Sequence, residues 1–396
     1  MSSEAEAFTV EPFHQINFGV EAGGHVTFVV THGWAEVNGC PLATETTHNV
    51  SGPRSFSVET MTGFALTVTR REQCSVKKHR LETYKLVKGY STVIANLSHA
   101  ARVSGAEGPC VLVFGPGNSD RTKFCQSVLN ACIANEQCPT FVDLDVSDNS
   151  LGPLGTVSYK NFTSGKPLDL LFEIPKCETL RCGSRDNTEE FVGVLDHLES
   201  LHRRRQAEDP DVGAGALVIR WRCESSGREE VRGILNVMMR FKTTYLMYTG
   251  DDATFGEIKA LSKCESRADA VKIIPRLTPG DDNVRKALES GRSSLFERKY
   301  LSGDLTECAT VFFENLKIYC LNDANEFERV ALNGKMENKF MCAVRAVDVH
   351  CNRKHLHLGM AVWVKGVSVE KKTVVLRACR NENAITGTFL ILDYDS

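Results

Sequence analysis

Residues 111–146 place an apolar strand, a glycine-containing loop, a helical segment and an acidic strand in immediate succession. Val111–Phe114 is the first apolar run, and it leads directly into the loop Gly115–Thr122. Apolar side chains then recur at helical spacing, and a second apolar run, Thr140–Val146, carries Asp145 near its end. This order predicts a βαβ unit, in which the loop joins the end of one parallel strand to the start of a helix.

The loop has the skeleton of a nucleotide-phosphate loop, which requires a glycine, four residues and then Gly-Lys-Ser/Thr. Gly115 and Thr122 fit this pattern, whereas Asp120 replaces the second glycine and Arg121 replaces the lysine. The planar guanidinium of an arginine copies a compact ammonium poorly when a phosphate must be touched end-on. A carboxylate about 4 to 5 Å from a phosphate oxygen would repel it by up to about 4 kcal/mol at an effective dielectric constant near 20. We therefore expect a weakened nucleotide site, and an ordinary α/β loop is the alternative for this fragment alone.

The candidate cofactor contacts are the residues of this loop. They are Gly115, Pro116, Gly117, Asn118, Ser119, Asp120, Arg121, Thr122 and Lys123. Backbone N–H groups of such a loop wrap a polyphosphate, and its hydroxyl holds Mg²⁺.

Composition limits the class of protein. A chain of 396 residues with 42% apolar and 24% charged residues is typical of a globular protein with two or three domains. The net charge of −3 gives no global attraction to nucleic acid, so any RNA contact must be local. No apolar stretch approaches the roughly 20 residues of a membrane span, and the acidic start is not a signal peptide. Fifteen cysteines without paired CxxC clusters indicate reduced thiols in the cytosol or nucleus.

The pattern of elements changes twice along the chain. The first eighty residues are rich in β-formers separated by short turns, which predicts a small β-sandwich. Buried strands alternate with helices in the middle third, which predicts a mainly parallel sheet, and strands return from Thr306. We therefore expect an α/β chain with a central P-loop NTPase-like domain (86–303), flanked by an N-terminal β-sandwich (1–85) and a C-terminal β-rich domain (304–396).

Several segments together resemble the polynucleotide 5′-hydroxyl-kinase family, which includes the P-loop subunit of the pre-mRNA cleavage and polyadenylation factor. The likeness follows the right order over nearly the whole chain, which is far more specific than a single loop. The segments that carry it are Gly33–Leu42, Val113–Pro116, Pro139–Val146, Phe313–Tyr319, Gly359–Val362 and Phe389–Asp393. The resemblance implies the same β, α/β, β architecture.

The resemblance also implies a site for ATP and Mg²⁺. Arg121 takes the place of the lysine, Thr122 the place of the Mg²⁺ ligand, and Asp145 the place of the catalytic base and of a second metal contact. Arg298 aligns with an arginine of the family's lid, and Gln15 falls where the family's β-domain contacts adenine. Phosphoryl transfer depends mostly on positioning and charge neutralisation, so each of these positions matters for catalysis.

Departures from the family pattern accumulate at this site. Besides Asp120 and Arg121, a Gly-Gln-Gly after the acidic strand has become Ser147–Asn149, and Trp221 is out of register with the tryptophan that packs against the nucleic-acid end. These changes favour a catalytically silent family member, a structural subunit of the nuclear pre-mRNA 3′-end cleavage machinery. Its expected partners are the scaffold subunit of the cleavage factor and RNA, and no membrane.

Two other readings stay open. One is an active ATP-dependent polynucleotide 5′-hydroxyl kinase that phosphorylates RNA ends in mRNA or tRNA processing, with Arg121 acting for the lysine and Asp145 as base. The other is a metal-dependent module built on Cys351, His355 and His357. Strand-like surroundings and the lack of a second clean ligand pair make this metal site the less favoured alternative.

Overall fold

A computed structural model gives the structure of this chain. It describes residues 5–52, 54–80, 84–116, 121–147, 149–152, 155–162, 178–181, 188–223, 228–249, 253–257, 260, 269–272, 306–321, 326–337, 339–346, 349, 357–358, 361–379 and 387–392. The chain forms two compact units. The first comprises Met1–Val142, Lys160–Glu173 and Leu198–Gly291, and the second comprises Asp143–Tyr159, Ile174–His197 and Arg292–Ser396.

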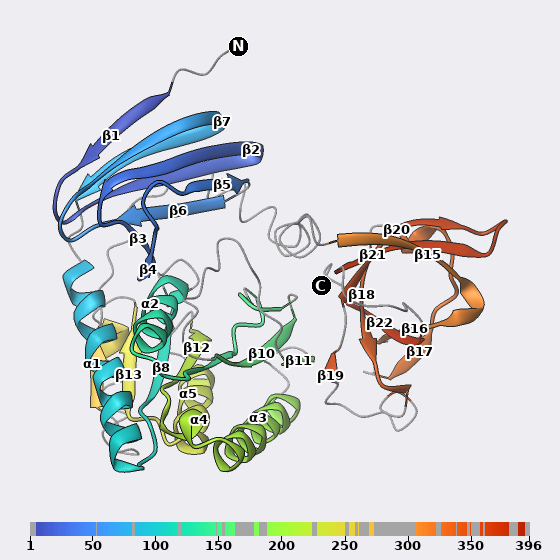
Figure 1. Ribbon diagram of the computed structural model, residues 1–396. Helices are drawn as coiled ribbons and strands as arrows, with labels where there is room; N and C mark the ends of the chain where they lie inside the picture. Colours follow the sequence, from blue (N-terminus) through green and yellow to red (C-terminus); the bar gives the residue numbers. More distant parts are fainter. Residues whose placement is uncertain are drawn as a thin grey trace. The chain divides into compact units, whose positions relative to one another are not determined.

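The N-terminal part of the first unit is a seven-stranded sheet, drawn in blue in Figure 1. Its strands are β1 Glu6–Val10, β2 His14–Gly33, β3 Glu36–Val37, β4 Cys40–Pro41, β5 Thr47–Ser51, β6 Arg54–Glu59 and β7 Phe64–Arg80. They lie in the order β1-β7-β2-β6-β3-β4, with β5 paired to β2. Alternate side chains of β2, such as Phe18 and Phe28, face the core, and both rings stack on Phe56. One of the expected short strands, residues 26–30, is part of the much longer β2, whose register with β7 shifts at three points.

The rest of the first unit contains a parallel sheet with helices. Strands β14, β13, β8, β12 and β9 lie side by side in that order, and the pairs β14–β13, β13–β8 and β8–β12 are parallel. The strands are β8 Cys110–Gly115, β9 Thr140–Asp143, β12 Leu217–Arg222, β13 Tyr245–Tyr248 and β14 Asp269–Lys272. The helices are α1 Tyr84–Ser104, α2 Arg121–Ala134, α4 Pro210–Ala214, α5 Arg228–Arg240 and the part of α3 Thr188–Glu208 that begins at Leu198. Val111–Phe114 is fully buried, as expected for a parallel strand covered on both faces.

The second unit contains antiparallel strands and the C-terminal sheet. Strands β10 Thr156–Asn161, β11 Glu178–Arg181 and β19 His357–Leu358 pair antiparallel in that order. The C-terminal sheet has the order β15-β21-β20-β18-β22-β16-β17. Its elements are β15 Thr306–Phe312, η1 Phe313–Asn315, β16 Leu316–Leu321, β17 Phe327–Arg329, η2 Gly334–Met336, β18 Phe340–Val344, β20 Ala361–Ser368, β21 Thr373–Cys379 and β22 Gly387–Leu392. Its core includes Met341, Val362, Leu376 and Phe389.

These sheets confirm the predicted order of a β-sandwich, a central α/β domain with a phosphate loop, and a β-rich region. The exact domain boundaries stay predictions. No helix among the residues that the structure describes has the length and apolarity needed to cross a bilayer.

Candidate functional site

The carboxyl ends of the parallel strands carry the predicted phosphate loop. In open α/β sheets, ligands bind outside this edge. Gly115 ends β8 with φ +155°, and a Cβ atom placed there would lie 2.4 Å from the Thr249 Oγ1 atom and 2.6 Å from its carbonyl oxygen. The backbone that follows β13 approaches Gly115 so closely that no side chain fits there, which explains the first glycine of the motif.

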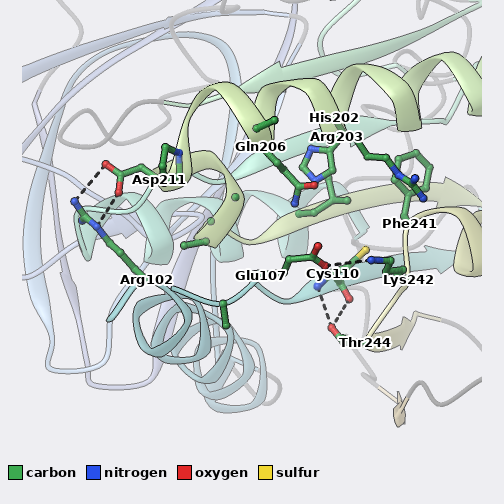
Figure 2. Close-up of a pocket in the computed structure, with 18 of the residues that line it drawn as sticks. Arg102, Glu107, Cys110, His202, Arg203, Gln206, Asp211, Phe241, Lys242 and Thr244 are labelled. Carbon is green, nitrogen blue, oxygen red and sulfur yellow. Dashed lines mark hydrogen bonds and ion pairs between the residues drawn. The ribbon is translucent and has the colours of Figure 1, made fainter. Parts of the chain in front are cut away.

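The amino edge of the same sheet carries a cavity of about 820 Å³ (Figure 2). Its lining carries charged side chains of both signs, and three ion pairs form among them. The Arg102 guanidinium lies 2.9 Å from the Asp211 carboxylate, and the Lys242 ammonium lies 3.5 Å from that of Glu107. Burial lowers the pKa of His202 to about 4, so this imidazole is neutral at pH 7. Because it lies at the edge of the sheet opposite the phosphate loop, this cavity is not the predicted nucleotide site.

Arg121 lies inside the fold. It begins α2, it is only 1% exposed, and its Nη1 donates a 2.6 Å hydrogen bond to the carbonyl oxygen of Trp221 on β12. From its place in the motif, we expected Arg121 to stand for a lysine that reaches phosphate, and this role stays a prediction. In the structure the guanidinium contacts the neighbouring strand.

Thr122 is bonded to a second buried arginine. The Nη1 atom of Arg220 donates to the Thr122 Oγ1 atom, and Arg220 is completely buried. Arg220 lies on β12 opposite Val113 of β8, so the register of the parallel sheet holds it beside the start of α2. Arg220 is not among the predicted functional residues, although an arginine within the apolar run 216–221 is a visible signal in the sequence.

This arrangement does not fit Mg²⁺ at Thr122. Mg²⁺ demands near-ideal octahedral geometry with oxygen ligands at about 2.0 to 2.1 Å. A guanidinium bonded to the Thr122 oxygen occupies that approach and repels a second cation. The metal contact of Thr122 stays a prediction, and it would require the Thr122 hydroxyl to leave Arg220.

Lys123 connects the loop to the N-terminal sheet. Its ammonium forms an ion pair with the carboxylate of Glu59, which ends β6 and is 1% exposed. Glu59 in turn lies opposite Gln15 of β2, a predicted adenine contact that is fully buried. The structure thus brings Gln15, Glu59 and Lys123 to one side of the loop, and the nucleotide-binding roles of Gln15 and Lys123 stay predictions.

Further polar contacts fasten this sheet to the helices. The Lys88 ammonium of α1 lies 3.1 and 2.9 Å from the two carboxylate oxygens of Glu36, which is 1% exposed. Asn38 donates from Nδ2 to the Gln126 Oε1 atom at 2.5 Å, and its carbonyl accepts a 2.9 Å bond from Asn130. These residues hold the β-sandwich against α1 and α2.

The acidic strand end belongs to the second unit. Asp145 is fully buried, and its Oδ1 accepts a 2.8 Å hydrogen bond from the Ser147 hydroxyl. The backbone N–H of Asp145 donates to Asp143, whose other carboxylate oxygen accepts from Ser150 at 2.7 Å. The catalytic and metal-binding roles of Asp145 stay predictions.

Trp221 does not form an open stacking surface. It is 4% exposed, and a Cβ atom placed on Gly233 of α5 would lie 2.8 Å from its ring. The alternation of β12 turns Trp221 toward α5 and Arg220 toward α2, because successive side chains of a strand point to opposite faces. Its close packing on a helical glycine makes Trp221 part of the core.

Several predicted site residues lie outside the described residues. They are Gly117, Asn118, Ser119, Asp120, Arg298, Cys351 and His355. Over the described part of the chain, no group of three or more His, Cys, Asp or Glu residues could hold a metal ion.

Family comparisons agree with the fold. The family model for the N-terminal beta-sandwich domain of polyadenylation factor matches residues 9–101. The family model described as mRNA cleavage and polyadenylation factor CLP1 P-loop matches residues 115–294. Together these two matches cover more than half of the chain.

Individual proteins show the same likeness. The chain is 25% identical to the mRNA cleavage and polyadenylation factor CLP1 of Pyricularia oryzae over 55% of its own length and 53% of that relative. It is 23% identical to the polyribonucleotide 5′-hydroxyl-kinase Clp1 of Danio rerio over 39% of its length and 35% of that relative. The chain therefore spans about half or less of these two relatives.

Solved structures show the same fold over the whole chain. A structure that describes the interface of Pcf11p with Clp1p, and ATP loss in a glycine-to-arginine point mutant, superimposes with a TM-score of 0.81. The superposition covers 99% of this chain and 98% of that chain at 14% identity. With the two family matches, these findings identify the family. The chain belongs to the family of the mRNA cleavage and polyadenylation factor CLP1.

Proposed function

We propose that this chain is a non-catalytic subunit of the nuclear machinery that cleaves and polyadenylates pre-mRNA. The observation that carries the proposal is that three cationic side chains at the phosphate loop are each bonded to another group of this chain. Arg121 is bonded to the Trp221 carbonyl, Arg220 to the Thr122 hydroxyl, and Lys123 to the Glu59 carboxylate. These contacts stabilise the fold rather than a transferred phosphoryl group.

The energetic requirement of phosphoryl transfer supports this reading. Catalysis depends on cations aimed at the charge that develops in the transition state. Removing a single such group typically costs about 10²- to 10³-fold in rate. Here the lysine is replaced by the buried Arg121, and Thr122, which stands at the expected Mg²⁺ position, is bonded to Arg220. We infer that ATP, where it binds, acts as a structural ligand.

The proposed partner is a Pcf11p-type scaffold subunit. Solved structures contain Clp1p in complex with Pcf11p, and they share the fold of this chain. With a net charge of −3, this chain offers RNA no general attraction, so RNA would be positioned mainly by the other subunits. The proposed location in the nucleus follows from this role in pre-mRNA processing.

Co-expression with the Pcf11p-type subunit of the same organism tests the proposal. We expect a complex that survives size-exclusion chromatography. We also expect the Asp145→Asn variant to form it equally well, because the proposed role needs no catalytic base. Failure of the wild-type chain to associate would contradict the proposal, and so would loss of the complex in Asp145→Asn protein of unchanged melting temperature.

The alternative function is an ATP-dependent 5′-hydroxyl kinase acting on RNA ends. The observation in its favour is Asp145, which lies two residues after β9 and accepts a hydrogen bond from Ser147. A kinase would require Arg121 to leave the Trp221 carbonyl and reach the γ-phosphate. Transfer of labelled phosphate that disappears in Asp145→Asn would establish this function.

A further inference from the structure

The cavity at the amino edge of the parallel sheet has the size of a ligand site and lies apart from the phosphate loop. Its volume of about 820 Å³ falls within the range of small-molecule sites. Cys110, which begins β8, lines this cavity, whereas Gly115 ends β8 at the loop. The six residues of that strand separate the two places by about 16 Å, at about 3.3 Å per residue. A ligand in this cavity would therefore occupy a second site.

One wall of the cavity offers neutral hydrogen-bonding groups. Gln206 and His202 lie one turn apart on α3 and face Glu107 across the cavity (Figure 2). The side-chain amide of Gln206 makes no hydrogen bond with any residue that the structure describes. His202 is 7% exposed, and burial keeps its imidazole neutral, so the ring carries one donor and one acceptor. Uncharged donors and acceptors side by side match the edge of a nucleobase better than they match an ion.

Lys242 lines the same cavity from a backbone position that favours glycine. It lies two residues after α5 with φ +48°, and the N–H of Thr243 bonds to the Met238 carbonyl, which is the common way for a helix to end at a left-handed residue. A lysine there strains the backbone, and its ion pair with Glu107 contributes little because both side chains are 68% exposed. Neither the backbone nor that pair explains Lys242. A negatively charged group bound against its ammonium would explain it.

The end of α3 adds further exposed cations. Arg203 lines the cavity, and Arg204 and Arg205 follow it, with side chains that are 65%, 64% and 43% exposed. Each of the three pairs with a glutamate of its own helix, three or four residues away. Pairs of this kind are weak, so a phosphate that shares or replaces one of them meets little resistance.

We propose that this cavity binds one nucleotide of single-stranded RNA, with the base inside against Gln206 and the phosphate at the rim against Lys242 and Arg203. The ring of Phe241 forms part of the wall, and unpaired bases stack on aromatic rings. The inference goes beyond the proposed function, because it gives a chain of net charge −3 a local contact with RNA.

Fluorescence anisotropy with a labelled single-stranded oligoribonucleotide of about ten nucleotides measures this binding. We expect the full chain to bind it saturably at low salt and more weakly as salt rises, because phosphate contacts release counterions. No binding up to about 100 μM protein, the weak end of non-specific nucleic-acid binding, would overturn the inference. So would equal competition by an unlabelled mononucleotide at the same concentration, because the ligand would then be a free nucleotide.

Lys242→Gly separates RNA binding from stability. Glycine relieves the left-handed backbone, so we expect the melting temperature to rise by roughly 2 to 4 °C. RNA binding should nevertheless weaken about fivefold, and the slope of log affinity against log salt should fall by about 0.7. The matched control is Lys372→Gly, which removes the same charge at φ +52° in the turn between β20 and β21. It should gain similar stability and keep the RNA affinity of the wild type.

Gln206→Leu tests the contact with the base. It keeps the size of the side chain and removes the amide, so we expect binding about three- to tenfold weaker with an unchanged salt slope. Wild-type affinity in Lys242→Gly or Gln206→Leu, or an equal loss in Lys372→Gly, would overturn the inference. A failure here would leave association with a Pcf11p-type subunit untouched, so the proposed function can survive it.

Discussion

The ion pair between Lys88 and Glu36 allows the attachment of the β-sandwich to be measured. Glu36 lies on β3 with 2% of its side chain exposed, whereas 32% of the Lys88 side chain reaches solvent. Replacing Lys88 with Met would remove the cation that contacts both oxygens of a buried carboxylate. Removing one partner of a fully buried pair costs about 3 to 5 kcal/mol, and the partial exposure of Lys88 lowers our expectation to about 2 kcal/mol.

Calorimetry of the wild type, Lys88→Met, Glu36→Gln and the double variant would measure the coupling between Lys88 and Glu36. A loss of about 2 kcal/mol should lower the melting temperature of the first unit by roughly 4 to 8 °C. The double variant Lys88→Met/Glu36→Gln should recover most of that loss, because it leaves no buried charge behind. The control is Lys242→Met, whose partner Glu107 lies 3.5 Å away and where both side chains are 68% exposed, so we expect no measurable change. The argument would be refuted if Lys88→Met and Glu36→Gln each lowered the melting temperature and the double variant lost the sum of the two decreases.

Three further perturbations follow from the structure. Burial lowers the pKa of His202 to about 4, so the stability that its neutral form gives the fold is fully present above pH 6.5 and falls by up to about 3 kcal/mol as the pH drops to 4. His202→Gln should flatten this part of the plot of melting temperature against pH, and an unchanged plot would contradict this. Gly115→Ala should cost about 2 kcal/mol or more, because its Cβ would overlap Thr249 at an unfavourable φ; an unchanged melting temperature would argue against this close approach. Burial raises the pKa of the Cys110 thiol to about 12; mass spectrometry after brief iodoacetamide treatment should find exposed Cys308 labelled and Cys110 protected, and equal labelling would disprove the burial.

Local patterns predicted the fold well. Apolar runs identified β8 and β9, and helical spacing identified α2, because these signals depend on residues close together in the chain. The alternation of β2 was equally visible, but its continuation through Gly23 and Gly24 was not. That continuity depends on pairing with β7, where the register shifts between Val20 and His25.

The site was less predictable because its contacts are long-range. The loop motif identified Arg121 and Thr122, yet their partners Trp221 and Arg220 lie about a hundred residues away in sequence. No local pattern states that a guanidinium will turn toward a neighbouring strand rather than toward solvent. The sheet register decides this, and it emerges only when β8 and β12 pair.

Transfer of labelled γ-phosphate to a 5′-hydroxyl oligoribonucleotide tests the central claim that the loop cations serve the fold rather than catalysis. The protein should be in excess over RNA, with Mg²⁺ present, so that a single slow turnover is visible. The account predicts no transfer above the level of the Asp145→Asn variant. Transfer by the wild-type chain that Asp145→Asn abolishes would contradict it, since catalysis would then require these cations to act on phosphate.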